Sequence, residues 1–360
     1  MTPPPPTRVI RTLKDGYWDH TEVIEMADGS LRVRKRNRAD IAPSPWGLES
    51  LRREIRYLAT VASQPDALFP PLLDHWDFQS DNQTPHVGYD HPFYANHRDA
   101  GQLARETALP QTEIDQFQDQ LATAMLHHIQ RPAISPNPLS THLNEAVGEA
   151  FATLARQPDL GVLLDAPMVR LNGSLRLGPS AAWQKIVHDS DLLTQADASP
   201  QTRLHGDFFL ENILWATQPD EDPPLVLIDP VSVAGVSVGP PVFDLVKYVS
   251  YATGELLALR SEWLDVSGFD ATPPKPGTAE PPAFTYRLQM DHPGLAPLRE
   301  RNWHSRLHAA FTTHYGPLSQ RLYHLIDGYF SAAMAANTTG TQQKGRLLKA
   351  TIEFNAALLG

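Results

Sequence analysis

The stretch that most limits how this chain can fold is RLHGDFFLENILW, residues 203–215. Polar residues at His205, Asp207 and Asn212 interrupt a run of large apolar side chains that a solvated loop would not contain. A buried strand would not carry an unpaired carboxylate and amide either, because burying such groups without partners costs free energy. The stretch therefore predicts a loop whose apolar side chains enter a core while its polar side chains face a cleft.

A second segment brings another polar residue to the same place. NILWA at 212–216 and LVLIDP at 225–230 both predict strands, joined by the hydrophilic connection TQPDEDPP. If the strands form a hairpin, the start of the first lies beside the end of the second, so Asn212 and Asp229 are neighbours. Carboxylate and amide oxygens are hard ligands that suit Mg²⁺. Asp207 precedes the first strand and is placed to act as a base on a hydroxyl.

The rest of the chain changes character near its first quarter. TEVIEMADGSLRVRKR, residues 21–36, predicts a hairpin, because Asp28-Gly29 is a favoured tight turn between extended segments. Residues 47–63 predict a helix from the 3-and-4 spacing of their leucines and isoleucine. Two more strands are expected before a break near residues 88–96, and helical patterns dominate from about residue 100 onward.

Composition excludes several classes of protein and site. The 360 residues include no cysteine, which rules out disulfides, thiolate catalysis and cysteine zinc sites. The net charge of −11 argues against a nucleic-acid-binding surface, which would be basic. No apolar run is long enough for a membrane span, and the first residues contain no apolar signal core. We therefore expect a cytoplasmic protein with neither nucleic acid nor membrane as a partner.

The motif pair resembles that of a known superfamily. HGDFFLENIL followed by LVLIDP is similar to the catalytic-loop and metal-loop pair of the aminoglycoside phosphotransferase and choline kinase group, which shares the protein-kinase fold. The resemblance implies an α+β, two-lobed fold with ATP and Mg²⁺ as cofactors. Residues 1–93 would form the nucleotide-binding lobe, a small antiparallel sheet with one helix. Residues 94–360 would form the larger, mainly helical lobe for catalysis and substrate binding.

The resemblance also implies roles for individual residues. Asp207 would accept the proton of the substrate hydroxyl, and Asn212 and Asp229 would hold Mg²⁺ on the phosphates. His205 would pack under the loop and fix its shape. In FDLVKY, which follows the metal loop, Asp244 would brace the catalytic loop from behind in a structural role.

A kinase also needs a lysine from the small lobe that reaches the phosphates and pairs with a helix glutamate. In LRVRKRN, alternation places Lys35 on the same face as Leu31 and Val33, an unusual place for a lysine. On the predicted helix, Glu54 lies about 70° from the centre of the apolar face, at its border. The sequence therefore predicts a pair between Lys35 and Glu54.

The nucleotide-binding part departs from the protein kinases. The segment LKDGYWDHTE, where the phosphate-covering loop is expected, contains only Gly16 and no G-x-G-x-x-G pattern. This favours the aminoglycoside phosphotransferase group, which often lacks that pattern. The adenine is expected against VGYDHPFY, with hydrogen bonds to the backbone from Tyr89 to His91.

The acceptor is expected to be a small molecule. Protein kinases usually place a lysine two residues after the catalytic aspartate, where this chain has Phe209, and no APE-like segment follows. A sugar, an aminoglycoside or an amino alcohol would fit. HGDFFLENIL, IDP and FDLVKY together also resemble motifs of phosphotransferase-like proteins found with polysaccharide synthesis, and this resemblance favours a sugar. The Pro-rich insertion at 265–295 is a candidate substrate lid. Two alternatives stay open: a catalytically inactive kinase-like protein that binds nucleotide or a partner, and a metal-dependent hydrolase.

Overall fold

The computed structural model of the chain divides into two compact units. Unit 1 comprises Met1–Leu103, Thr123–Ile129 and Leu204–Ser237, and unit 2 comprises Ala104–Ala122, Gln130–Arg203 and Val238–Gly360. Unit 1 thus includes both the N-terminal strands and residues 205–212, which we call the polar loop. The predicted boundary between two lobes at residue 93 stays a prediction. The structure describes residues 3–16, 18–38, 40–41, 44–61, 68–106, 109–135, 137–216, 223–231, 235–269 and 284–359.

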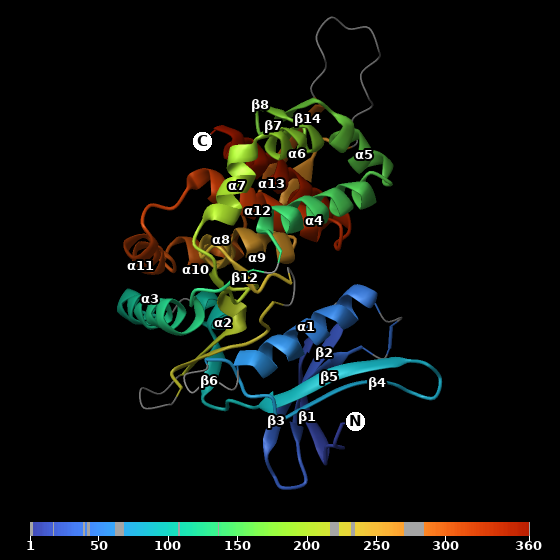
Figure 1. The fold of residues 1–360 in the computed structure, drawn as a ribbon, viewed down its shortest axis with the longest axis vertical. Helices are drawn as coiled ribbons and strands as arrows, with labels where there is room; N and C mark the ends of the chain where they lie inside the picture. The colour runs from blue at the N-terminus through green and yellow to red at the C-terminus, as the bar shows by residue number, and fades with distance from the viewer. Residues whose placement is uncertain are drawn as a thin grey trace, which may run out of the picture. The chain divides into compact units, whose positions relative to one another are not determined.

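Unit 1 is built on a five-stranded antiparallel sheet (Figure 1). The predicted hairpin is confirmed: Glu25 pairs with Leu31 at its closed end, and the Asp28 carboxylate accepts hydrogen bonds from Ser30. Gly29 supplies the positive φ, 79°, that this turn requires. In spatial order the strands are β1 (Arg8–Asp15), β2 (Asp19–Glu25), β3 (Leu31–Asn37), β5 (Pro85–Pro92) and β4 (Asp74–Gln79).

The predicted helix is α1, Pro45–Val61, and it packs against β3 and β5. Its buried face contains the leucines and isoleucine whose spacing predicted it, together with Glu54. The Tyr57 hydroxyl donates a hydrogen bond to the Leu204 carbonyl oxygen at 2.7 Å. The helix therefore contacts both the sheet and Leu204, the residue directly before His205.

A smaller sheet of unit 1 positions the two predicted loops, the catalytic loop and the metal loop. As predicted, β10 (Ile213–Ala216) and β11 (Leu225–Leu227) are antiparallel, with Ile213 opposite Leu227. A third strand, β6 (His97–Asp99), pairs with the other edge of β10. Three residues are too few for any periodicity to show in the sequence, which is why β6 escaped prediction.

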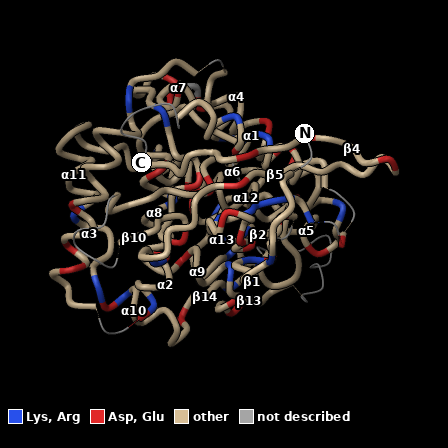
Figure 2. Tube along the Cα trace, turned by 90° about the horizontal axis from the view of Figure 1, so that it is seen from below, with Lys and Arg blue, Asp and Glu red and all other residues tan. Residues whose placement is uncertain are grey.

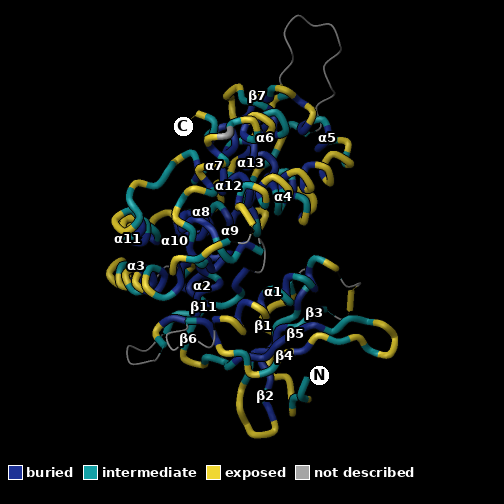
Figure 3. Tube along the Cα trace, viewed as in Figure 1, coloured by how far each residue is buried: buried dark blue, intermediate teal, exposed yellow. Residues whose placement is uncertain are grey.

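The predicted helix-rich character of the rest of the chain is confirmed. Figure 3 shows buried segments along α12 (Gln320–Ala335) and α13 (Gly340–Leu359), which pack on each other. Gly328 permits this approach, because a Cβ there would lie 2.5 Å from the Phe354 ring. The other helices are α2 (Ala100–Arg105), α3 (Gln111–Ala124), α4 (Leu139–Leu154), α5 (Pro158–Asp165), α6 (Pro179–His188), α7 (Ser190–Ala198), α8 (Val242–Ala252), α9 (Glu255–Arg260), α10 (Ala296–Arg299) and α11 (Ser305–Tyr315).

Unit 2 also contains a four-stranded sheet that the sequence analysis missed. Its order is β13 (Asp265–Ser267), β14 (Phe284–Gln289), β7 (Met168–Leu171) and β8 (Ser174–Leu177). The turn between β7 and β8 is Asn172-Gly173, with φ values of 50° and 82°. Residues 270–283, the centre of the predicted lid, lie outside the described residues, and the ends of that insertion form β13 and β14.

Charged residues and helix hydropathy can both be followed along the described chain. Figure 2 shows basic and acidic residues distributed along the described trace, with consecutive basic residues at Arg34–Arg36 on β3. In the part of the chain that the structure describes, no helix combines the length and the apolar character needed to cross a bilayer.

Candidate active site

His205 anchors the start of the polar loop. The ring is fully buried, with Nε2 3.0 Å from the Ile228 carbonyl oxygen and Nδ1 accepting from the Asp207 backbone N–H at 3.3 Å. These two partners select the neutral tautomer in which Nε2 carries the proton. Burial lowers the pKa of His205 to about 4, so the ring stays neutral. The histidine thus links the loop to the residue that follows β11.

The two turns that hold the polar residues have unusual backbone conformations. Gly206 has a φ of 80°, and a Cβ there would lie 2.3 Å from the Val236 carbonyl oxygen. Asp229 and Val231 also have positive φ, 54° and 51°, which is costly for residues with a side chain and most of all for a β-branched one. The Val231 N–H donates to the His205 carbonyl oxygen at 2.7 Å. Backbone strain of this kind persists only where the surrounding structure enforces it, and such residues are frequent at functional sites.

Asp207 and Asn212 are almost completely buried and contact each other. The Asn212 amide donates to the Asp207 carbonyl oxygen at 2.8 Å and approaches the carboxylate Oδ2 at 3.4 Å. Both of these side-chain contacts use the Asn212 Nδ2, and its Oδ1 is an acceptor that can serve as a ligand. The Ile228 N–H donates to the Asn212 carbonyl oxygen at 3.0 Å, which brings Asn212 beside Asp229 as the hairpin predicted.

Lys35 lies at the centre of a buried cluster of carboxylates. Its ammonium is 2.8 Å from Glu54 Oε2, 2.9 Å from Asp229 Oδ1 and 3.5 Å from Asp19 Oδ2. The pair that strand alternation and helical angle predicted is therefore present. Asp19 was not singled out from the sequence, because nothing local distinguishes it from a surface carboxylate. Lys14 was missed for the same reason; its ammonium is 3.8 Å from Asp229 Oδ2.

The charges of the cluster shift several pKa values. Burial opposes the charge of Lys35, but Asp229 and Glu54 raise its pKa well above the usual value. Burial would raise the pKa of Asp229, yet Lys35 and Lys14 hold it well below the ordinary range. Burial raises the pKa of Glu54 to about 7 against the opposing effect of Lys35. The carboxylates of Asp19, Glu54 and Asp229 thus surround the Lys35 ammonium, and Lys14 is a second cation beside Asp229.

A pocket of about 570 Å³ opens beside this cluster, within the size range of small-molecule and cofactor sites. It brings together Lys35, Asn212 and Asp229 with an apolar lining. Among the residues around it are Arg11, Leu13 and Lys14 of β1, Thr21 of β2, Val33 of β3, Phe93, Tyr94 and Ala95 after β5, Leu214 of β10, and Ile228, which follows β11.

The two residues expected at the base of the nucleotide lie differently. His91 lines the pocket, and burial lowers its pKa. Tyr89 does not line it: its backbone is paired on both sides, with Lys35 and His75, and its hydroxyl donates to Glu54 Oε2 at 2.9 Å. Tyr89 therefore supports the Lys35–Glu54 pair from behind, a position that strand alternation alone could not reveal.

Asp244 lies in the first turn of α8, at the position where the motif predicted a helix to begin. Its side chain is fully buried. Because Asp244 belongs to unit 2 and the polar loop belongs to unit 1, its role as a brace for that loop stays a prediction.

Comparisons with known proteins agree with the motifs. The model of the phosphotransferase enzyme family matches residues 15–276. A solved structure assigned as a fructosamine-3-kinase from Thermobifida fusca YX-ER1 has a TM-score of 0.55 at 16% identity, covering 99% of this chain and 94% of its own. The GDP complex of wild-type aminoglycoside 2'-phosphotransferase-IIIa has a TM-score of 0.51 at 13% identity, with coverages of 97% and 93%. No curated protein matches the chain in a sequence search.

At such identities the two structures support the fold, and the predicted α+β kinase-like fold is confirmed. The family match is independent of them and spans the hairpin of Lys35, the helix of Glu54 and the loop from His205 to Asp229. It also confirms the resemblance drawn from HGDFFLENIL and LVLIDP. The chain belongs to the phosphotransferase enzyme family.

Proposed function

We propose that the chain is a small-molecule kinase that transfers the γ-phosphate of ATP, with Mg²⁺, to a hydroxyl of a sugar, an aminoglycoside or an amino alcohol. The observation that carries the proposal is the position of Lys35, which joins Glu54 of α1 to Asp229 at the wall of a nucleotide-sized pocket. A lysine held by a helix glutamate beside a metal-binding aspartate is the arrangement that positions the phosphates in kinases.

Asp229 and Asn212 would hold the Mg²⁺. Both line the pocket, and both offer the oxygen ligands that Mg²⁺ prefers. The bound ion would neutralise the charge of the β- and γ-phosphates. Lys14, on β1, would add a second positive charge on the phosphate side, in place of the glycine-rich loop that this chain lacks.

We place the purine against the apolar part of the pocket, between Val33, Leu214 and Ile228. Its polar edge would meet the segment Phe93–Ala95 rather than Tyr89, because that segment lines the pocket and lies beyond the end of β5. The GDP bound to aminoglycoside 2'-phosphotransferase-IIIa supports a purine nucleotide and makes guanine the alternative base.

Asp207 would accept the proton of the acceptor hydroxyl while the oxygen of that hydroxyl bonds to the γ-phosphorus. The bond from that phosphorus to the bridging oxygen breaks, ADP leaves with the electron pair, and Asp207 then returns the proton to solvent. Phe209, which replaces the lysine that protein kinases have at this position, is buried and contributes to the core. This supports a small molecule rather than a protein as the acceptor.

The test is ADP release in the presence of Mg-ATP against a panel of sugars, aminoglycosides and amino alcohols. At least one acceptor should stimulate ADP release by the wild type, and Asp207→Asn should abolish that stimulation. Asp77→Asn is the matched control, because Asp77 is exposed on β4, pairs with Arg52 and does not line the pocket. Wild-type protein that neither binds Mg-nucleotide nor releases ADP would refute the proposal. Nucleotide binding without transfer across the panel would favour the catalytically inactive alternative.

A further inference from the structure

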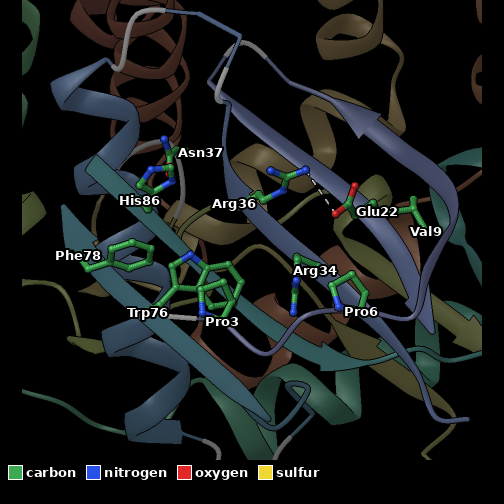
Figure 4. Close-up of a pocket in the computed structure, with 10 residues that line it drawn as sticks. All are labelled: Pro3, Pro6, Val9, Glu22, Arg34, Arg36, Asn37, Trp76, Phe78 and His86. Atoms are coloured by element: carbon green, nitrogen blue, oxygen red, sulfur yellow. Dashed lines mark ion pairs between the residues drawn. The ribbon is translucent and has the colours of Figure 1, made fainter. Parts of the chain in front are cut away.

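The opposite face of the five-stranded sheet carries a second pocket, of about 300 Å³ (Figure 4). Strand alternation directs Arg34 and Arg36 of β3 to this face, away from Lys35 and helix α1. Strands form the floor of the pocket, and Pro3 and Pro6 of the segment before β1 line one side of it. The pocket is lined by Pro3, Pro6, Val9, Glu22, Arg34, Arg36, Asn37, Trp76, Phe78 and His86.

A proline segment of the chain itself occupies one side of this surface. Arg34 binds both carboxylate oxygens of Asp90 at 2.8 Å, and its Nη2 also donates to the Pro4 carbonyl oxygen at 2.8 Å. The same guanidinium lies 5.1 Å from the centre of the Trp76 ring. Prolines have no N–H, so a run of them offers only rings and carbonyl acceptors. A donor on a proline carbonyl beside a tryptophan is the way in which aromatic grooves bind proline-rich segments.

The aromatic wall continues past this segment along β4 and β5. Phe78 and His86 stack with ring centres 5.0 Å apart and line the pocket together with Trp76. Trp76 can lie flat on β5 because its partner is Gly88, where a Cβ would be 2.5 Å from the indole. Trp76 is buried, whereas Phe78 and His86 are partly exposed and offer flat aromatic surfaces of the kind that pyrrolidine rings pack against.

Arg36 supplies the polar group that such a ligand would need. Its Nε is buried and has no hydrogen-bond acceptor among the described residues, and its pair with Glu22 is long, at 3.5 Å (Figure 4). Arg36 thus places a second guanidinium on this face, two residues further along β3 than Arg34, whose Nη2 holds Pro4. The Arg36 side chain is 41% exposed, so its terminal N–H groups can donate to a carbonyl of a further prolyl residue.

We propose that this face of the sheet is a docking surface for a proline-rich segment of a partner protein, and that residues 3–6 occupy part of it in the isolated chain. A tethered segment acts at an effective concentration in the millimolar range, so it competes strongly with a partner. Loosening residues 3–6 should therefore expose the surface to ligands added in solution.

The test measures binding of fluorescein-labelled decaproline by fluorescence anisotropy. The full-length variant Pro3→Ser, Pro4→Gly, Pro5→Ser, Pro6→Gly should bind the probe at least tenfold more tightly than the wild type does. Adding Arg36→Met to that variant should weaken binding at least fivefold. Arg52→Met is the matched control and should leave binding unchanged, because Arg52 pairs with Asp77 outside the pocket. An alanine-based peptide of equal length should not bind.

Thermal unfolding of each variant separates loss of binding from loss of fold. Binding of decaproline to the wild-type chain is also measured, at millimolar peptide concentration. The absence of saturable binding to both proteins overturns the proposal. Binding that Arg36→Met leaves unchanged also overturns it. Binding of the peptide MTPPPPT without binding of decaproline would mean that the surface serves only the chain's own N-terminal segment, which contradicts a partner.

Discussion

Replacing Lys35 with methionine tests the reasoning about the buried cluster most directly. Lys35 is 3% exposed, and its ammonium lies 2.8 Å from Glu54 Oε2 and 2.9 Å from Asp229 Oδ1. Removing one partner of a buried ion pair leaves an uncompensated charge and typically costs about 3–5 kcal/mol. We expect Lys35→Met to lower the free energy of unfolding by about that amount at pH 8.

The loss of stability should shrink as the pH falls. The pKa of Glu54 is already about 7 with Lys35 present, because burial disfavours the carboxylate. Without the lysine it rises further, so the folded state binds a proton that the unfolded state does not bind until lower pH. The variant therefore gains stability relative to the wild type between pH 8 and pH 5. Urea unfolding at the two values measures the difference.

Nucleotide binding should weaken as well. A hydrogen bond from a charged group contributes about 1.5–3 kcal/mol, which corresponds to a loss in affinity of roughly 10- to 150-fold. Isothermal titration with Mg-ATP measures it, with Arg52→Met as the control. In the double variant Lys35→Met, Glu54→Met, part of the stability should return without any return of affinity. Affinity within twofold of the wild type in a folded Lys35→Met protein would refute this reading of the cluster.

Four further changes probe the loop and the phosphate side. Asp207→Asn should lower kcat in an ADP-release assay about 10²- to 10⁴-fold, while the Kd for Mg-ATP changes little because Asp207 does not line the pocket. Gly206→Ala should lower the free energy of unfolding in urea by more than about 1 kcal/mol, given its positive φ and the nearby carbonyl of Val236. The pKa of His205 is about 4 when folded, so its contribution is complete above pH 6.5 and should fall by about 3 kcal/mol towards pH 4; His205→Gln should flatten that dependence in urea titrations. Lys14→Met should weaken Mg-ATP binding a few fold, and less at high salt, because Lys14 is half exposed.

The parts of the site that the sequence predicted are those where local geometry and chemistry agree. Strand alternation selected Lys35, helical angle selected Glu54, and the kinase chemistry required the two to meet, which they do at 2.8 Å. Closure of a short hairpin brought Asn212 to Asp229 across the chain. In each case the repeat of a strand (two residues) or of a helix (3.6 residues), together with one contact that the chemistry required, was enough to predict the pair.

The parts that escaped prediction depend on contacts that no local period encodes. Asp19 and Lys14 look like surface charges until the sheet places them near Lys35 and Asp229. The segment VGYDHPFY was expected to meet the adenine with its backbone; the pairing of Tyr89 with Lys35 and His75, and its hydroxyl's hydrogen bond to Glu54, depend on contacts outside that segment. The sheet of unit 2 is a different case: Asn172-Gly173 between two apolar-alternating segments is a strong hairpin signal that was available in the sequence.

Strand β3 explains why Lys35 can be held so closely. A slip of one residue in a sheet exchanges its two faces, so register is specified wherever the faces differ. Here both faces carry a buried ion pair: Lys35 with Glu54 on the side of α1, and Arg34 with both oxygens of Asp90 on the other. A slip would present Arg34 to Glu54 and would leave Asp90 buried without its bidentate partner, which costs more than an exposed mismatch. The arginine on the outer face therefore keeps the lysine in place on the inner one, and its own burial requires the cover that Trp76 and the proline segment provide.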